Sequence, residues 1–83
     1  MKPDQETSRT IQGRLEVLTK GMVSEENSVQ YYETLIGQTP ADTEENIGKR
    51  RMYGDLKQEE MKHVEKFKSL IRHWEEKLRE LEE

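Results

Sequence analysis

The sequence predicts an all-α fold, a long two-helix antiparallel hairpin that dimerises, or forms a higher oligomer, into a four-helix bundle. Two segments carry apolar residues at alternating spacings of three and four, which is typical of one helix face. A short segment with a proline separates them. Two helices with one apolar stripe each cannot enclose a core, so other copies must cover the stripes. Residues 1–83 are therefore expected to form one half-bundle domain.

The first helix is expected at about residues 8–37, where Thr7 or Ser8 can cap its start. Its apolar stripe consists of Ile11, Leu15, Leu18, Met22, Val29, Tyr32 and Ile36. One member of this series is missing, because the position that continues the stripe in its middle is Glu25. An acidic residue on an apolar face is the first sign of a functional site.

The connection between the helices is expected at about residues 38–42. Gly37 suits the C′ position, where glycine commonly ends a helix, and Pro40 favours a loop. Asp42 or Thr43 can cap the helix that follows. The connection is short enough to make the two helices antiparallel neighbours.

The second helix is expected at about residues 43–82. Its stripe consists of Tyr53, Leu56, Phe67, Leu70 or Ile71, Trp74, Leu78 and Leu81. The middle of this stripe is also interrupted, here by Glu60 and His63. Residues three apart project from the same side of a helix, so these two side chains share the stripe face. Folding back at the connection is expected to bring Glu25 and Glu60 to similar levels, within about one or two helical turns.

Composition excludes several kinds of function. The chain has no cysteine, which excludes disulfides, thiolate nucleophiles and iron–sulfur clusters. Its net charge is −4, and acidic and basic residues are mixed, so neither nucleic acid nor an anionic membrane is an expected partner. No apolar run is long enough to span a bilayer, and the first residues do not resemble a secretory signal. We therefore expect a cytoplasmic location.

Glu25, Glu60 and His63 together suggest a metal centre. Burying an unpaired charge costs several kcal/mol, so such residues need partners. Glu-x-x-His on one helix with a lone Glu on another is a ligand pattern of di-iron bundles. Two copies would supply four carboxylates and two imidazoles, and the four negative charges would offset two divalent cations. These donors suit iron or manganese, and zinc is not excluded.

The same residues also have ordinary interpretations. Glu25 can be a solvated charge if its helix rotates slightly, and His63 can be a hydrogen-bonded interface histidine. A shift of one residue would exchange Glu60 for Glu59, although Glu59 lacks the three-residue spacing to His63. His73 falls off the stripe and is expected at the surface.

The spacing Glu25-x6-Tyr32 followed by Glu60-x-x-His63 resembles the motif pair of the rubrerythrin and ferritin-like superfamily. The segments EENSVQYYETL and QEEMKHVEKF carry the likeness. A chain with one such pair resembles the two-helix encapsulated ferritins, which build a di-iron site between subunits. The resemblance implies that Glu25 is a terminal ligand, Glu60 a bridging ligand and His63 an imidazole ligand. It also implies that Tyr32, an ordinary core residue otherwise, lies near the iron and takes part in catalysis.

The resemblance implies ferroxidase activity, the oxidation of Fe(II) by oxygen or peroxide for iron storage or detoxification. It implies a homodimer or higher homo-oligomer, and an encapsulin shell as partner and compartment. The C-terminal LRELEE, however, does not resemble the targeting peptides of that family, and no rubredoxin-like cysteine domain is present. The alternatives are a metal-free helical interaction module and a metal-binding bundle without turnover.

Overall fold

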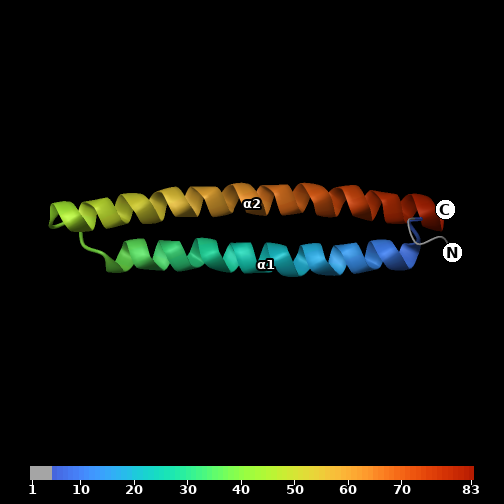
Figure 1. The fold of residues 1–83 in the computed structure, drawn as a ribbon, viewed down its shortest axis with the longest axis horizontal. Helices are drawn as coiled ribbons and strands as arrows, with labels where there is room; N and C mark the ends of the chain where they lie inside the picture. Colours follow the sequence, from blue (N-terminus) through green and yellow to red (C-terminus); the bar gives the residue numbers. More distant parts are fainter. Residues whose placement is uncertain (1–4) are drawn as a thin grey trace.

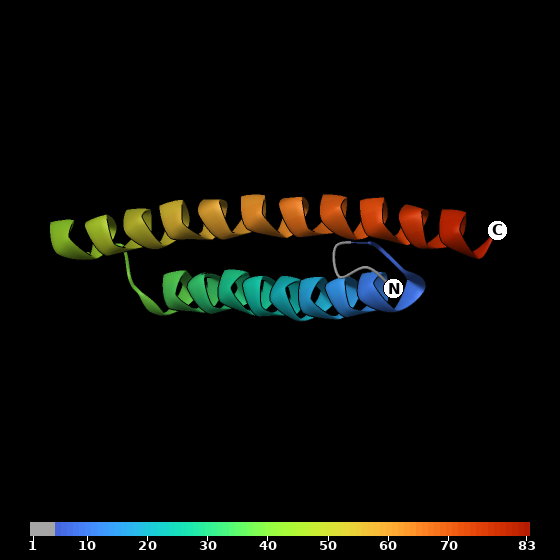
Figure 2. The ribbon, with the colours of Figure 1, turned by 45° about the vertical axis from the view of Figure 1, so that its right-hand side comes forward.

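Two antiparallel helices form the computed structural model, which describes residues 5–83 (Figure 1). Helix α1 spans Ser8–Gln38 and helix α2 spans Glu44–Glu82. They lie side by side in both views, in a rod of 61 × 20 × 15 Å (Figure 2). The all-helical hairpin is thus as predicted, and residues 1–4 of the expected single domain lie outside the described residues. No helix within residues 5–83 combines the length and the apolar character that a membrane crossing requires.

Threonines begin both helices. The Thr7 hydroxyl accepts a hydrogen bond from the Thr10 backbone N–H at 3.2 Å, and the Thr10 hydroxyl accepts one from the Thr7 N–H at 2.8 Å. This reciprocal capping box satisfies two otherwise unpaired donors. The Thr43 hydroxyl accepts from the Asn46 N–H at 3.1 Å, and two acidic residues in the first turn of α2 suit its dipole. Of the cap alternatives, Thr7 and Thr43 are therefore the ones used.

The end of α1 differs from the sequence prediction. Gly37 is not a C′ residue, because the helix continues through it to Gln38 and no glycine in residues 5–83 has a positive φ. The Thr39 backbone N–H donates to the Ile36 carbonyl instead. Arg50 reaches across from α2 and donates to the carbonyls of Ile36 and Thr39, each at 2.6 Å. In a glycine cap, backbone N–H groups would pair with the last carbonyls of the helix. Here the guanidinium of Arg50, from the other helix, pairs with carbonyls at this helix end instead.

The two apolar stripes face each other, but they bury very little. Only Ile11 and Val64 are buried among the described hydrophobic side chains, with 1% and 8% of their surface exposed. The other predicted stripe residues of α1 are half-buried. On α2, Ile71 rather than Leu70 lies inward, and Leu81 is exposed. Val64 lies four residues after Glu60 and three before Phe67, so it continues the α2 stripe. The expectation that His63 holds this stripe position was wrong, because Val64 is buried there and the side chain of His63 is 52% exposed.

A small cluster secures the start of α1 against the last third of α2. The Arg14 guanidinium lies 4.2 Å from the ring centre of Trp74, a cation–π contact. The same guanidinium pairs with Glu6 at 2.9 Å. Its hydrogen bond holds the pKa of the Glu6 carboxyl below the usual value. These contacts fix the register of the helices at the end opposite the loop.

Candidate metal centre

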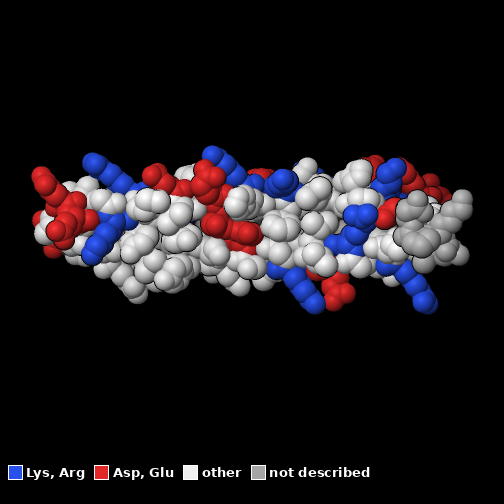
Figure 3. Space-filling model, viewed as in Figure 1, with Lys and Arg blue, Asp and Glu red and all other residues white. Residues whose placement is uncertain are grey.

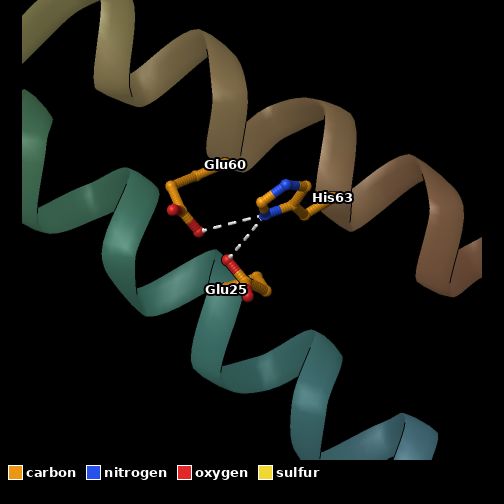
Figure 4. Close-up of side chains that lie close together, drawn as sticks. All are labelled: Glu25, Glu60 and His63. Atoms are coloured by element: carbon orange, nitrogen blue, oxygen red, sulfur yellow. Dashed lines mark ion pairs between the residues drawn. The ribbon is translucent and has the colours of Figure 1, made fainter.

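The two interruptions of the stripes meet near the middle of the hairpin. Glu25 projects from α1 toward Glu60 and His63, which project from α2 (Figure 4). One ligand atom from each residue can be chosen so that all three lie within 4.8 Å of one another. The sequence prediction that the hairpin brings these residues to one level therefore agrees with the structure.

The ligand atoms have the separations that a shared metal ion requires. The Nδ1 atom of His63 lies 3.6 Å from an oxygen of Glu25 and 3.8 Å from an oxygen of Glu60. Both separations are too long for a hydrogen bond. An ion with bonds of about 2.0–2.2 Å holds its ligand atoms at most about 4.4 Å apart. Both histidine–carboxylate separations fall within that limit, so each carboxylate could share one divalent cation with the imidazole.

The two carboxylates of the cluster are more enclosed than its imidazole. The side chains of Glu25 and Glu60 are 27% and 22% exposed, whereas that of His63 is 52% exposed. A hollow of about 300 Å³ adjoins the cluster, and its lining residues are Glu25, His63, Lys66, Phe67 and Leu70. The three ligands therefore have room beside them for further donors.

The neighbouring candidate ligands lie outside the cluster. Glu59 is exposed and pairs with Lys62 at 3.1 Å. His73 is exposed, as expected, and its ring meets Trp74 edge-on at 4.9 Å between centroids. The structure thus places Glu60, and not Glu59, with His63.

Tyr32 is not part of the three-residue cluster. It lies seven residues after Glu25, which is about two helical turns along α1. Its ring stacks on Tyr53 at 6.5 Å, and Tyr31 is tilted against it at 5.6 Å. Tyr32 therefore packs in an aromatic layer between the site and the loop, and its catalytic role stays a prediction.

The sequence analysis missed a close contact beside the ligands. A Cβ atom at Gly21 would lie 2.7 Å from two ring atoms of Phe67. No signal in the sequence singles out Gly21, because the other four glycines also lie within helices and a Cβ on any of them would meet nothing within 4 Å. Gly21 precedes Glu25 by one helical turn, and Phe67 follows His63 by one.

Comparison with known proteins finds no relative: no family model, no curated protein and no solved structure matches the chain. Its function has to be inferred from the ligand geometry and from the surfaces that the hairpin leaves open.

Proposed function

We propose that this protein belongs to the ferritin-like superfamily, that two copies enclose a pair of iron ions, and that it oxidises Fe(II) to Fe(III). One observation carries the proposal. Two carboxylates and one imidazole, from different helices, place ligand atoms within 4.8 Å of one another, and the imidazole is half exposed. This is half of the ligand set of a carboxylate-bridged di-iron bundle.

The ligand count calls for a second copy. One chain supplies Glu25, Glu60 and His63, which leaves an ion with free coordination positions. A second chain related by a two-fold axis would bring the same three ligands close to the imidazole. The resulting four carboxylates would neutralise two divalent ions. The half-exposed imidazole of His63 and the adjoining hollow are where that copy would approach.

The apolar surface calls for a second copy as well. A chain of 83 residues with two buried hydrophobic side chains in its described part has little core to stabilise it. Large apolar side chains remain between 37% and 70% exposed, namely Val17, Val23, Tyr31, Met52, Met61, Leu70 and Leu81. Figure 3 shows a broad surface along the rod that is neither acidic nor basic, with acidic atoms near its middle. Pairing of two hairpins into a four-helix bundle would cover such a surface.

Iron is the substrate in this proposal. Two Fe(II) ions give up two electrons, which together with two protons from solvent reduce dioxygen to hydrogen peroxide, or hydrogen peroxide to two water molecules. Carboxylate oxygens favour the harder and more highly charged Fe(III), so Glu25 and Glu60 would promote the oxidation. His63 would complete the set and help to hold each ion in place. The protein would act in the cytoplasm, free or inside an encapsulin shell.

Oxygen consumption after anaerobic loading with Fe(II) tests the proposal. The wild type and His73→Ala should consume oxygen faster than Fe(II) in buffer, and His63→Ala should not. Binding of Fe(II) without faster consumption would instead favour a storage or sensing bundle. An absence of binding for Fe(II), Mn(II) and Zn(II) would favour a metal-free interaction module.

A further inference from the structure

The contact between Gly21 and Phe67 is exceptional among the glycines of residues 5–83. An ideal Cβ at Gly21 would lie 2.7 Å from Cε1 and Cζ of Phe67, and 3.6 Å from its Cδ1. Ordinary van der Waals contact begins at 3.4 Å. A Cβ at any of the other described glycines would meet nothing within 4 Å; these are Gly13, Gly37, Gly48 and Gly54. Gly21 is therefore the one described glycine at which the packing leaves no room for a side chain.

We propose that Gly21 and Phe67 form a spacer that sets the distance between α1 and α2 at the metal ligands. Both are positioning residues, since the spacer acts on the ion only through Glu25 and His63. This inference rests on the proposed function. It names the two residues that would set the spacing of the metal ligands across the helices. The ring of Phe67 lies against the bare backbone of α1, in space that a Cβ at Gly21 would take, so an added side chain must displace the ring or the helix.

The ligands are sensitive to this distance. Gly21 and Glu25 are four residues apart on α1, and His63 and Phe67 are four apart on α2, so the spacer is the layer next to the ligands. A side chain at Gly21 must move the Phe67 contact from 2.7 Å to at least 3.4 Å. The separation of 3.8 Å between His63 and Glu60 lies within one helix, but that of 3.6 Å between His63 and Glu25 spans both. A comparable widening would bring the latter to the limit of about 4.4 Å for one ion.

A second way to relieve the clash at Gly21, rotation of the Phe67 ring, would also affect the candidate metal site. The ring of Phe67 can turn away from α1 instead of forcing the helices apart. Phe67, however, lines the same hollow as Glu25 and His63. A displaced ring would therefore change the space beside the ligands, where further donors must enter.

A size exchange tests the spacer. Gly21→Ala adds the clashing Cβ, and Phe67→Leu removes the two ring atoms that it would meet while keeping carbons near the Cδ position. Gly13→Ala is the matched control, because it lies on the same helix and its Cβ meets nothing within 4 Å. The probe is Co(II) alone, whose visible absorption reports its ligands, and circular dichroism checks helix content. Loss of supporting contacts around metal ligands typically costs about 10–100-fold in metal affinity.

We expect Gly21→Ala to weaken Co(II) binding about 10–100-fold and to alter the visible spectrum at unchanged helix content. Phe67→Leu alone should also weaken binding, because the spacer is shortened. The double variant should bind more tightly than either single variant, and Gly13→Ala should bind like the wild type. The change in the Co(II) spectrum at unchanged helix content, and its reversal in the double variant, are what a merely destabilising substitution would not produce.

Wild-type affinity in Gly21→Ala, or a double variant no better than the single ones, would overturn the spacer and leave the proposed function standing. A wild type that binds no metal would overturn both. If Gly21→Ala fails to fold, Phe67→Leu decides: wild-type affinity and spectrum in that variant would overturn the spacer, and weaker binding that the added Cβ restores would support it.

Discussion

The Nδ1 atom of His63 on α2 lies 3.6 Å from the Oε2 atom of Glu25 on α1, at a distance too long for a hydrogen bond. The Oε2 atom of Glu60 lies 3.8 Å from the same nitrogen, which is also too long for a hydrogen bond. A bound cation would satisfy all three donors at once. The hairpin therefore presents a candidate metal site whose proposed ligands come from both of its helices.

Removal of any ligand should abolish tight metal binding. Glu60→Gln keeps the shape of the side chain but replaces an anionic oxygen donor with an amide, so metal affinity should fall by more than about 100-fold, beyond the usual cost of losing an outer partner. Glu25→Ala and His63→Ala should behave in the same way. Glu59→Gln is the matched control, because Glu59 pairs with Lys62 at the surface. Isothermal titration with Mn(II) measures the affinities. If Glu59→Gln removes the metal and Glu60→Gln does not, the ligand assignment is wrong by one position.

Protons and metal should have opposite effects on each other at this site. Both bind the carboxylates and the imidazole, so acid should displace the metal. In the absence of metal, four carboxylates at one interface repel each other by on the order of 1–4 kcal/mol per close pair. Mild acid should therefore tighten the metal-free dimer while it weakens metal binding. Sedimentation of metal-free protein over a pH series checks this, and a dimer constant that is the same in Glu25→Gln and the wild type at every pH would contradict it.

Arg50 should stabilise the hairpin from the end of α1. Its guanidinium donates to two carbonyls, of Ile36 and Thr39, at 2.6 Å each. Hydrogen bonds that involve a charged group contribute about 1.5–3 kcal/mol. We expect Arg50→Met to lower the free energy of unfolding by about that amount, whereas Arg51→Met, at its exposed neighbour, should change it little. Urea unfolding of the metal-free protein measures both, and equal losses in the two variants would argue against the cap.

The pair of Glu6 and Arg14 should give a small pH dependence. The hydrogen bond from Arg14 lowers the pKa of Glu6, so its contribution is complete above the usual carboxyl pKa and is lost as the pH falls through the lowered value. Glu6→Gln should therefore melt slightly below the wild type at neutral pH, and the difference should vanish in acid. Thermal melting at both pH values tests this. A difference that persists or grows in acid would mean that Glu6 acts by some means other than its charge.

The fold and the ligand level followed from the sequence because they depend on local rules. The spacing of apolar residues placed both helices, and the threonines at their starts placed the first residue of each to within one position. A short connection between helices of similar length brings Glu25 back to the level of Glu60. The three-residue spacing then decided between Glu60 and Glu59.

What the sequence did not predict depends on contacts between the helices. Gly37 has the residue type of a helix end, but Arg50, which is distant in the chain, supplies the cap. The burial of Val64 and the contact of Gly21 with Phe67 depend on the rotation of α2 about its axis, which a periodic pattern fixes only approximately. The proposed pairing of the exposed apolar face with a second copy is likewise a property of two chains and not of one.

Molecular mass under anaerobic Fe(II) titration tests the central claim most directly. Native mass spectrometry counts chains and metal ions in the same particle. We expect dimers, or multiples of them, that carry two iron ions for every two chains. Metal should shift the equilibrium toward these species because the shared site links binding to association. A monomer that binds iron alone, or an oligomer that forms equally well and stays free of metal, would contradict a site built between two copies.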